Sequence, residues 1–463
     1  MVFTDLTFLF GFLPVVWLLY RYVSRTHLAN LYILIVSLLF YAWGGLTSLL
    51  TLLIILLWNY GAAHTIGASE DEHTSKIMLW TAIGVDLFIV LFYRYIGVWF
   101  GFLSPTLSRL PSLMPMGLSF YMFSCMSCLF DVYYGRAEAP ASFVEFGVFA
   151  AFFGRINMGP IAHYAKMKEQ LEDHPTSRQK TFDGMTLFLQ GLFRKVILAD
   201  NFALIFAALA GNTSWVGSLL YGFAYFFQLY FDFSGYSRMA RGIGSLFGFT
   251  IDPNFSLPYM ALSVQEFWRR WHISLSSFFR DYVYIPLGGS RGGTLIYVRN
   301  MIVVWFLTGL WHGASWNYVL WGLYYLCFLL LERFVIRQRI PNGWNRLYTL
   351  SVVLLGTVIF RFEDANTLLL AFKGLFGLNG AGFFSWSVWS VFLSNIFLIA
   401  ACMIGCTTLS VWIERLFSVW ASNNSVGFAL YSIEQVALPL FLLAISVLAL
   451  IGNAYNPFLY FQF

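Results

Sequence analysis

Apolar runs of about twenty residues recur along this chain of 463 residues, and they constrain its fold more than any other feature. A helix of about 20 residues crosses the hydrocarbon core of a bilayer. Only 11% of the residues are charged, whereas soluble globular proteins carry about 25%. Backbone groups in lipid need partners inside the protein, and a helix supplies them within its own segment. The chain is therefore predicted to be an all-α, polytopic membrane helical bundle.

The succession of apolar runs predicts about 11 transmembrane helices, together with re-entrant or interfacial helices. The longest predicted spans include Leu46–Thr65, Met78–Phe102, Asp183–Leu209, Trp215–Phe233, Phe384–Ile413 and Phe428–Ile451. Mixed charges in His163–Lys180 indicate an amphipathic segment at the membrane interface. Because neither a soluble domain nor an internal repeat is evident, we expect a single integral membrane domain over residues 1–463. The first apolar run leads into more membrane sequence, which favours a first helix over a cleaved signal peptide.

The charged residues indicate the orientation of the chain in the membrane more than they indicate binding partners. Arg21 and Arg25 follow the first span, and four arginines lie between Arg333 and Arg346. Lysine and arginine favour cytoplasmic loops, so the N-terminus is predicted to lie outside. The net charge of +5 is dispersed, which argues against a nucleic-acid partner and leaves membrane lipid as the expected surroundings. The five cysteines have no polar context, so we interpret them as small buried apolar residues.

Two Trp-His pairs, Trp271-His272 and Trp311-His312, lie in the stretch from Ser263 to Tyr318. His312 follows an uncharged run, Met301–Leu310. Ionisable side chains at membrane depth usually face a bundle interior or a water-filled cavity. A neutral imidazole there can take a proton from a hydroxyl or a thiol. The residues alone leave two alternatives open for His312, a general base or a buried histidine bonded to a carbonyl.

If Gln265–Arg280 is one helix, Gln265, Arg269, His272, Ser276 and Arg280 form one polar stripe, with Arg270 beside it. An interfacial helix whose arginines reach headgroups would show this pattern. A cradle for phosphate would show it too, because arginine makes paired hydrogen bonds to phosphate oxygens.

Asp232 ends an apolar span, one helical turn after Gln228. It either pairs with a nearby cation, Arg238 or Arg241, or orients a catalytic group. No pair of histidines has the spacing HExxH, so we predict no metal. We also expect no bound cofactor.

Several motifs resemble those of the membrane-bound O-acyltransferase (MBOAT) superfamily, and more narrowly those of its alginate O-acetyltransferase branch. They are FLFGFLP (Phe8–Pro14), PMGLSFY (Pro115–Tyr121), GLFRKVILAD (Gly191–Asp200), QLYFDFSGYS (Gln228–Ser237), EFWRRWHISLSSFFRDYVYIPLGG (Glu266–Gly289) and GLWHG (Gly309–Gly313). The chain departs from the family pattern at Arg238, where members often have Asp, and at GRINM (Gly154–Met158).

The resemblance implies a helical bundle around a central tunnel, with His312 as the catalytic histidine and His272 as the family's second polar position. It implies an O-acyltransferase. We expect acetyl-CoA as the co-substrate, with its phosphates on Arg269, Arg270 and Arg280. His312 would be the general base and His272 would position the donor or relay a proton.

Around these histidines, Trp311 and Asn317 are candidate donors to the oxyanion, with Asp232 and Gln228 as supporting residues. No serine or cysteine apart from Ser315 lies beside His312 in the sequence, which favours direct transfer.

The expected acceptor is a hydroxyl of a polysaccharide or of peptidoglycan outside the cytoplasm, reached directly or through a periplasmic partner transferase of the SGNH type. The expected location is the inner membrane of a bacterium. Two alternatives stay open. One is D-alanyl transfer to teichoic acid, performed by another branch of the superfamily. The other is a transporter with a histidine proton path, although such proteins often carry internal repeats.

Overall fold

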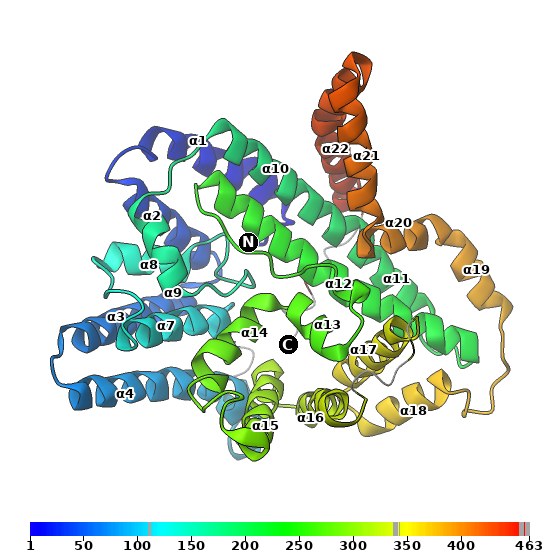
Figure 1. Cartoon of the computed structure of the whole chain (residues 1–463), viewed down its shortest axis with the longest axis horizontal. Coiled ribbons are helices and arrows are strands. Elements are labelled where there is room, and N and C mark those ends of the chain that lie inside the picture. The colour runs from blue at the N-terminus through cyan, green and yellow to red at the C-terminus, as the bar shows by residue number, and fades with distance from the viewer. Residues whose placement is uncertain (110–112, 337–340, 342, 453–457, 459–463) are drawn as a thin grey trace. The chain divides into compact units, whose positions relative to one another are not determined.

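The computed structural model consists of helices (Figure 1). It describes residues 1–109, 113–336, 341, 343–452 and 458, and within these residues no β-strand occurs. The all-α class is therefore confirmed for the described chain. The chain divides into two compact units. Unit 1 comprises Met1–Phe188, Ser237–Pro253 and Ser274–Leu287, and unit 2 comprises Leu189–Tyr236, Asn254–Ile273 and Gly288–Phe463. Compact units need not be separate domains, so the single integral membrane domain stays a prediction.

Unit 1 is built from the N-terminal helices, with two later pieces of chain added to them. Its elements are η1 (Phe8–Phe12), α1 (Leu13–Val23), α2 (Ala29–Ala42), α3 (Leu46–Ala68), α4 (Glu72–Leu91), η2 (Phe92–Ile96), α5 (Gly97–Phe100), η3 (Gly101–Leu103), α6 (Pro105–Ser108), α7 (Leu118–Tyr133), α8 (Phe143–Ala151), α9 (Tyr164–Glu172), most of α10 (Arg178–Phe193) and α14 (Ile273–Phe279), and η7 (Arg280–Tyr284). Nearly every residue of α7 is buried, so this helix is the core of the unit. The predicted amphipathic segment is confirmed in part, because α9 lies within it.

Unit 2 holds both Trp-His pairs. Its elements are η5 (Arg194–Ala199), α11 (Asp200–Ala208), the first part of α12 (Trp215–Leu246), η6 (Pro258–Met260), α13 (Val264–Arg270), α15 (Gly293–His312), α16 (Trp316–Leu331), η8 (Glu332–Ile336), α17 (Asn345–Arg361), α18 (Ala365–Leu375), α19 (Trp386–Ser394), α20 (Ile396–Cys406), α21 (Leu409–Asn423) and α22 (Ser425–Gly452).

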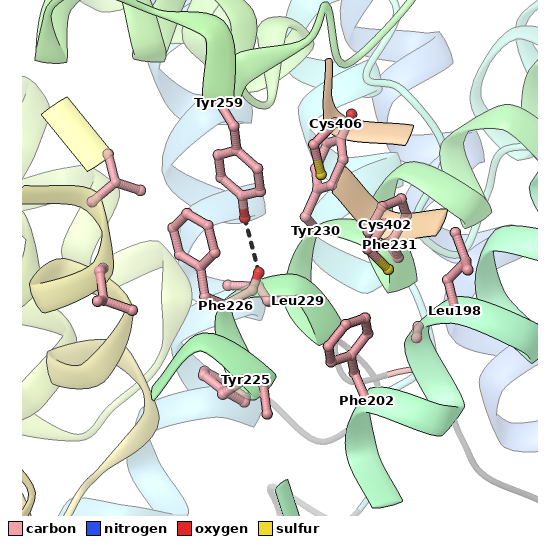
Figure 2. Packing of buried hydrophobic residues seen from close by; sticks show 14 of the residues in the cluster. Leu198, Phe202, Tyr225, Phe226, Leu229, Tyr230, Phe231, Tyr259, Cys402 and Cys406 are labelled. Atoms are coloured by element: carbon pink, nitrogen blue, oxygen red, sulfur yellow. Dashed lines mark hydrogen bonds between the residues drawn. The ribbon is translucent and has the colours of Figure 1, made fainter. Parts of the chain in front are cut away.

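An aromatic core holds α12, η6, α13 and α20 together in unit 2. Figure 2 shows the part of this core that comes from α12, η6 and α20. The Tyr259 hydroxyl donates to the backbone carbonyl of Phe226 at 2.8 Å. Cys402 and Cys406 are buried in the same cluster, as the interpretation of the cysteines predicts. Cys125 and Cys128 are buried as well, but Cys327 is exposed. Trp271 also belongs to this core, so its neighbour His272 is attached to a well-packed support.

Five helical stretches are long and apolar enough to cross a membrane, within the residues that the structure describes. They are Leu46–Ala68, Glu72–Leu103, Gly293–His312, Trp316–Ile336 and Ser425–Gly452. The pair α19 and α20, bent by 63°, could supply a sixth. The chain is therefore an integral membrane protein. About 11 crossings stay a prediction, because α1, α2 and α7 are apolar but shorter than a full span.

Two stretches differ from the sequence-based expectation. Gln265–Arg280 is not one helix, since α13 ends at Arg270 and α14 begins at Ile273. The prediction of a single polar stripe from Gln265 to Arg280 is therefore wrong. The glycines in Met239–Phe249 predict a short separate piece after the span Trp215–Phe233. This prediction is wrong too, because α12 continues to Leu246. Gly242 lets α12 approach the backbone of α10 at Gly184, so this glycine serves close packing rather than a break.

Candidate active site

His312 is the last residue of α15 and is 4% exposed. Its ring lies among aromatic rings, with centroid distances of 4.6 Å to Trp311, 4.8 Å to Trp321 and 5.0 Å to Phe360. The ring is therefore held in a fixed orientation inside unit 2 by contacts with α16 and α17.

Three glycines hold the end of α15 against α16. A side chain at Gly309 would reach 2.6 Å from the carbonyl oxygen of Tyr318, and one at Gly322 would collide with the carbonyl of Trp305. One at Gly313 would collide with the Tyr318 ring. Small residues at these points allow the two helices to approach closely. The GLWHG motif therefore sets the position of His312 as well as supplying it.

His272 lies at the break between α13 and α14, with φ of 45°. The left-handed region costs an ordinary residue about 1–3 kcal/mol, so the surrounding structure must hold it there. Two backbone hydrogen bonds do so. The Ser256 N–H donates to the Arg270 carbonyl and the Ile273 N–H donates to the Asn254 carbonyl, both at 3.0 Å.

The imidazole of His272 is 2% exposed, and neither ring nitrogen has a hydrogen-bond partner among the described residues. Burial lowers the pKa of His272 to about 3, so the ring is neutral near pH 7. A buried polar group without a partner costs about 1–3 kcal/mol. This residue combines that cost with a strained backbone, a combination that is typical of functional sites.

Trp311 brings the two histidines into one site. Its ring centroid lies 4.6 Å from that of His312 and 5.8 Å from that of His272. Phe233 on α12 covers His272 from another direction, with its ring at 4.7 Å. His272 and His312, which are 40 positions apart in the sequence, therefore both contact the Trp311 ring. A single site that contains both histidines requires such a contact.

Asp232 precedes Phe233 and is 1% exposed. The cation that the structure describes beside it is Lys195, whose Nζ lies 2.7 Å from Asp232 and 2.8 Å from Asp200. The two alternatives for Asp232, a pair with Arg238 or Arg241 and the orientation of a catalytic group, stay predictions. Gln228 is buried on α12, one turn before Asp232. The α12 segment that covers His272 is thus anchored by a buried ion pair.

Asn317 is fully buried at the start of α16. Its amide nitrogen donates to the carbonyls of Ile359 and Phe360, at 3.3 and 3.0 Å. Its oxygen has no hydrogen-bond partner among the described residues. These two hydrogen bonds hold Phe360 against His312. Both use the amide nitrogen of Asn317, so the remaining polar atom of this side chain is its oxygen, which is an acceptor.

The three arginines predicted to meet phosphate are in different situations. Arg269, in the last turn of α13, is exposed and has no described partner. Arg270 forms an ion pair with Glu266 at 2.6 Å. Arg280 belongs to unit 1 and binds Asp281 through two hydrogen bonds of 2.6 and 2.9 Å. Within unit 2 the structure brings together Arg269 and Arg270, and it leaves Arg269 the more available for an anion.

Sequence reasoning missed Lys195, although this residue lies in the motif GLFRKVILAD. A lysine inside an apolar run is rare, and that rarity was the available signal. The aromatic residues Phe233, Trp321 and Phe360 were also missed. No local pattern distinguishes them from the other aromatic residues, which make up 20% of the chain.

Comparison with known proteins bears on the same residues. The family model of MBOAT, the membrane-bound O-acyltransferase family, matches residues 133–372, which include both Trp-His pairs. The "Probable alginate O-acetylase AlgI" of Pseudomonas putida is 34% identical, with 100% of each chain covered. The "Peptidoglycan O-acetyltransferase" of Helicobacter pylori is 30% identical over 100% of this chain and 98% of its own. The "Teichoic acid D-alanyltransferase" of Bacillus subtilis is 26% identical over 50% of this chain and 61% of its own.

Proposed function

This chain belongs to the membrane-bound O-acyltransferase family and is an O-acyltransferase, and from that premise we propose which group it transfers, from where and to where. The donor is a cytoplasmic thioester, acetyl-CoA, and the acceptor is a hydroxyl of a polysaccharide or of peptidoglycan outside the cytoplasm. Of the relatives named above, the alginate O-acetylase at 34% identity and the peptidoglycan O-acetyltransferase at 30% cover the whole chain, whereas the D-alanyltransferase covers half of it at 26%. This difference supports acetyl over D-alanyl as the transferred group.

His312 is the general base in this proposal. It takes the proton of the acceptor hydroxyl, the oxygen attacks the thioester carbonyl, and the thiolate leaves and is protonated. A positioned base contributes about 10²–10⁴-fold to the rate, and alignment of donor and acceptor supplies much of the remainder. His272 positions the donor or relays a proton. Neither of its ring nitrogens forms a hydrogen bond with a described residue, so both can bind the donor.

The remaining site residues support this chemistry. Trp311 holds both imidazoles and offers its indole N–H to the oxyanion. Asn317 fixes Phe360 behind His312, and Asp232 with Gln228 fixes the α12 segment beside His272. A tunnel through the bundle gives the donor and the acceptor access to His312 from the two membrane faces.

At the mouth of this tunnel, Arg269 meets the donor phosphates first, since Arg270 and Arg280 are already paired with carboxylates. Arg270 joins Arg269 by exchanging Glu266 for phosphate.

The location that fits this reaction is the inner membrane of a bacterium, where cytoplasmic acetyl-CoA and an external glycan lie on opposite sides. A periplasmic transferase of the SGNH type takes the acyl group onward in the relayed form of the reaction. Direct transfer to the glycan is the simpler form.

The observation that carries the proposal is the shared contact of His272 and His312 with Trp311, inside the segment that the family model matches. The test uses the full chain in nanodiscs, with acetyl-CoA and soluble alginate or peptidoglycan fragments. We expect release of free CoA and an acetyl ester on the glycan. Thiol release without any acetylated glycan or partner would overturn the proposed acceptor.

Two further outcomes decide between the alternatives. Transfer from a D-alanyl carrier protein, with none from acetyl-CoA, would favour the teichoic acid reaction, which the Bacillus subtilis relative's name specifies for that protein. Proton or solute flux without thiol release would favour a transporter.

A further inference from the structure

Unit 1 contains a second histidine site that the proposed reaction does not use. His163, 8% exposed, precedes α9, and Ser277 lies on α14. The Nε2 atom of His163 lies 3.1 Å from the Ser277 Oγ, and its Nδ1 atom lies 3.2 Å from the Tyr282 hydroxyl. The Tyr282 hydroxyl in turn lies 3.0 Å from the Asp131 carboxylate. A hydroxyl, an imidazole, a phenol and a carboxylate thus form one hydrogen-bonded series.

The positions of the protons in this series follow from counting donors. Tyr282 has one hydroxyl proton, and the carboxylate of Asp131, 1% exposed, is its stronger acceptor. The Nδ1 atom of His163 faces the oxygen of Tyr282, and Asp281 lies 3.7 Å away on the same side. Both are acceptors here, so Nδ1 carries the proton. The Nε2 atom then carries no proton, and it accepts a hydrogen bond from the Ser277 hydroxyl.

The protonation states support this assignment. Burial lowers the pKa of His163, so its ring is neutral near pH 7 and can act as a base. Burial raises the pKa of Tyr282, which therefore remains a phenol and a donor. Asp131 also accepts the Ala165 N–H at 2.9 Å and lies 3.5 Å from Arg136, and these contacts hold its side chain in place.

Ser277 is only partly buried. The Ser277 hydroxyl has a second acceptor, the Ser274 carbonyl at 2.9 Å. Rotation about one bond moves its proton between that carbonyl and His163. Serine–histidine contacts of this kind, with the imidazole oriented by a third group, activate serine for attack on acyl carbon.

We propose that Ser277, with His163 as its base and Tyr282 and Asp131 as positioning residues, is an acyl-accepting nucleophile in unit 1. Its substrates are activated acyl esters and thioesters. The choice of an acyl thioester as the natural donor rests on the proposed function. The Ser277 oxygen bonds to the acyl carbon while its proton moves to His163 Nε2. The C–S bond breaks, and the thiolate leaves with that proton. The product is an ester of Ser277 and a free thiol.

The nucleophile can be tested without a thioester. The full chain in nanodiscs is treated with a fluorophosphonate, whose phosphorus takes the serine oxygen and releases fluoride, and the labelled peptide is mapped by mass spectrometry. We expect the label on Ser277, absent after heat denaturation. His163→Gln should slow labelling about 100-fold, the lower end of the effect of a positioned base.

The control is Ser24→Ala, because the Ser24 hydroxyl also bonds a carbonyl three residues earlier but has no histidine among its described partners. It should label as the wild type does. Wild-type protein without label on Ser277, or equal labelling of the His163→Gln variant, would overturn the nucleophile. Such a result would make the series a purely structural link.

A second experiment separates this site from the proposed function. With acetyl-CoA carrying a radioactive acetyl group, we expect an alkali-labile label on Ser277 in the wild type and in His312→Ala. Ser277→Ala should lose it. Labelling of Ser277 by both the fluorophosphonate and the thioester, without acyl transfer to any glycan or partner, would sink the proposed function alone. Acyl transfer to a glycan with an unreactive Ser277 would sink this inference alone. Reaction with fluorophosphonate but never with the thioester would overturn the donor class.

Discussion

The two histidine sites differ in what surrounds the imidazole. In unit 2 the rings of His272 and His312 pack against Trp311, and the nitrogens of His272 have no described partner. In unit 1 both nitrogens of His163 are in hydrogen bonds. A ring with satisfied nitrogens has a fixed tautomer and acts on the group it already touches. A ring with unsatisfied nitrogens carries a cost that a bound substrate can recover. The first is suited to activating a resident serine, and the second to receiving a substrate.

The two units also differ in the burial of their ion pairs, and we expect the largest effect, a loss of stability, from breaking the buried pair in unit 2. Replacing Lys195 by leucine leaves the Asp232 carboxylate buried without its described cation, which costs about 3–5 kcal/mol. The matched change in unit 1 is Lys166→Leu, whose pair with Asp252 is exposed at both ends and is worth at most about 1 kcal/mol. Thermal unfolding in detergent measures both. Equal losses of stability would contradict the anchoring role of Lys195.

The next effect concerns the position of His312. Gly313→Ala forces the Tyr318 ring to move and shifts the end of α15. A displacement of about 1 Å near reacting groups can cost about 100-fold in rate. We therefore expect acyl transfer to fall by about that factor while the protein stays folded. Gly61→Ala, where nothing lies within 4 Å of the added carbon, is the control. Full activity in Gly313→Ala would show that the tight contact with Tyr318 does not set the site.

A smaller effect on the transfer rate tests whether the ring nitrogens of His272 bind the substrate. Asparagine tolerates the left-handed backbone, so His272→Asn keeps the break between α13 and α14 and removes the imidazole. We expect initial rates of transfer about tenfold below wild type, less than the loss of a general base. Leu257 has the same φ of 45°, and Leu257→Asn should leave the rate unchanged. Unchanged rates in both variants would mean that His272 is only a structural residue.

The smallest effect concerns the donor. Arg269→Gln removes an exposed cation, and an exposed charge pair is worth up to about 1 kcal/mol. The KM for acetyl-CoA should therefore rise about threefold to fivefold, with kcat unchanged. The comparison variant is Arg25→Gln, which removes an exposed cation from a loop of unit 1. A KM that stays at the wild-type value would remove Arg269 from the phosphate site.

The sequence predicted the helical class and the membrane location because each leaves a local signal. Charge deficit and apolar length indicate membrane helices, and the GLWHG motif marks the end of α15. The break at His272 could not be predicted, because the backbone on either side of it is held by two hydrogen bonds, one accepted by the Asn254 carbonyl and one donated by the Ser256 N–H. The contact of Lys195 with Asp232 could not be predicted either. Both depend on pairs of residues that are distant in sequence, and one sequence carries no record of such pairs.

The same reason explains why His163 was given no role. Its neighbours come from two other stretches, Asp131 from α7 and Ser277 with Tyr282 from Ser274–Leu287, and only the fold of unit 1 assembles them. In the sequence His163 is one of seven histidines, without a spacing that marks it.

The central claim is that His312 takes the acceptor proton, and the most direct test is the initial rate of acceptor-dependent CoA release by His312→Ala. The variant is assayed in nanodiscs at saturating acetyl-CoA, beside wild type matched for folded protein. We predict a loss of at least about 100-fold, with acetyl-CoA binding retained. A rate within about threefold of wild type would contradict this role, because no positioned base would then have been removed.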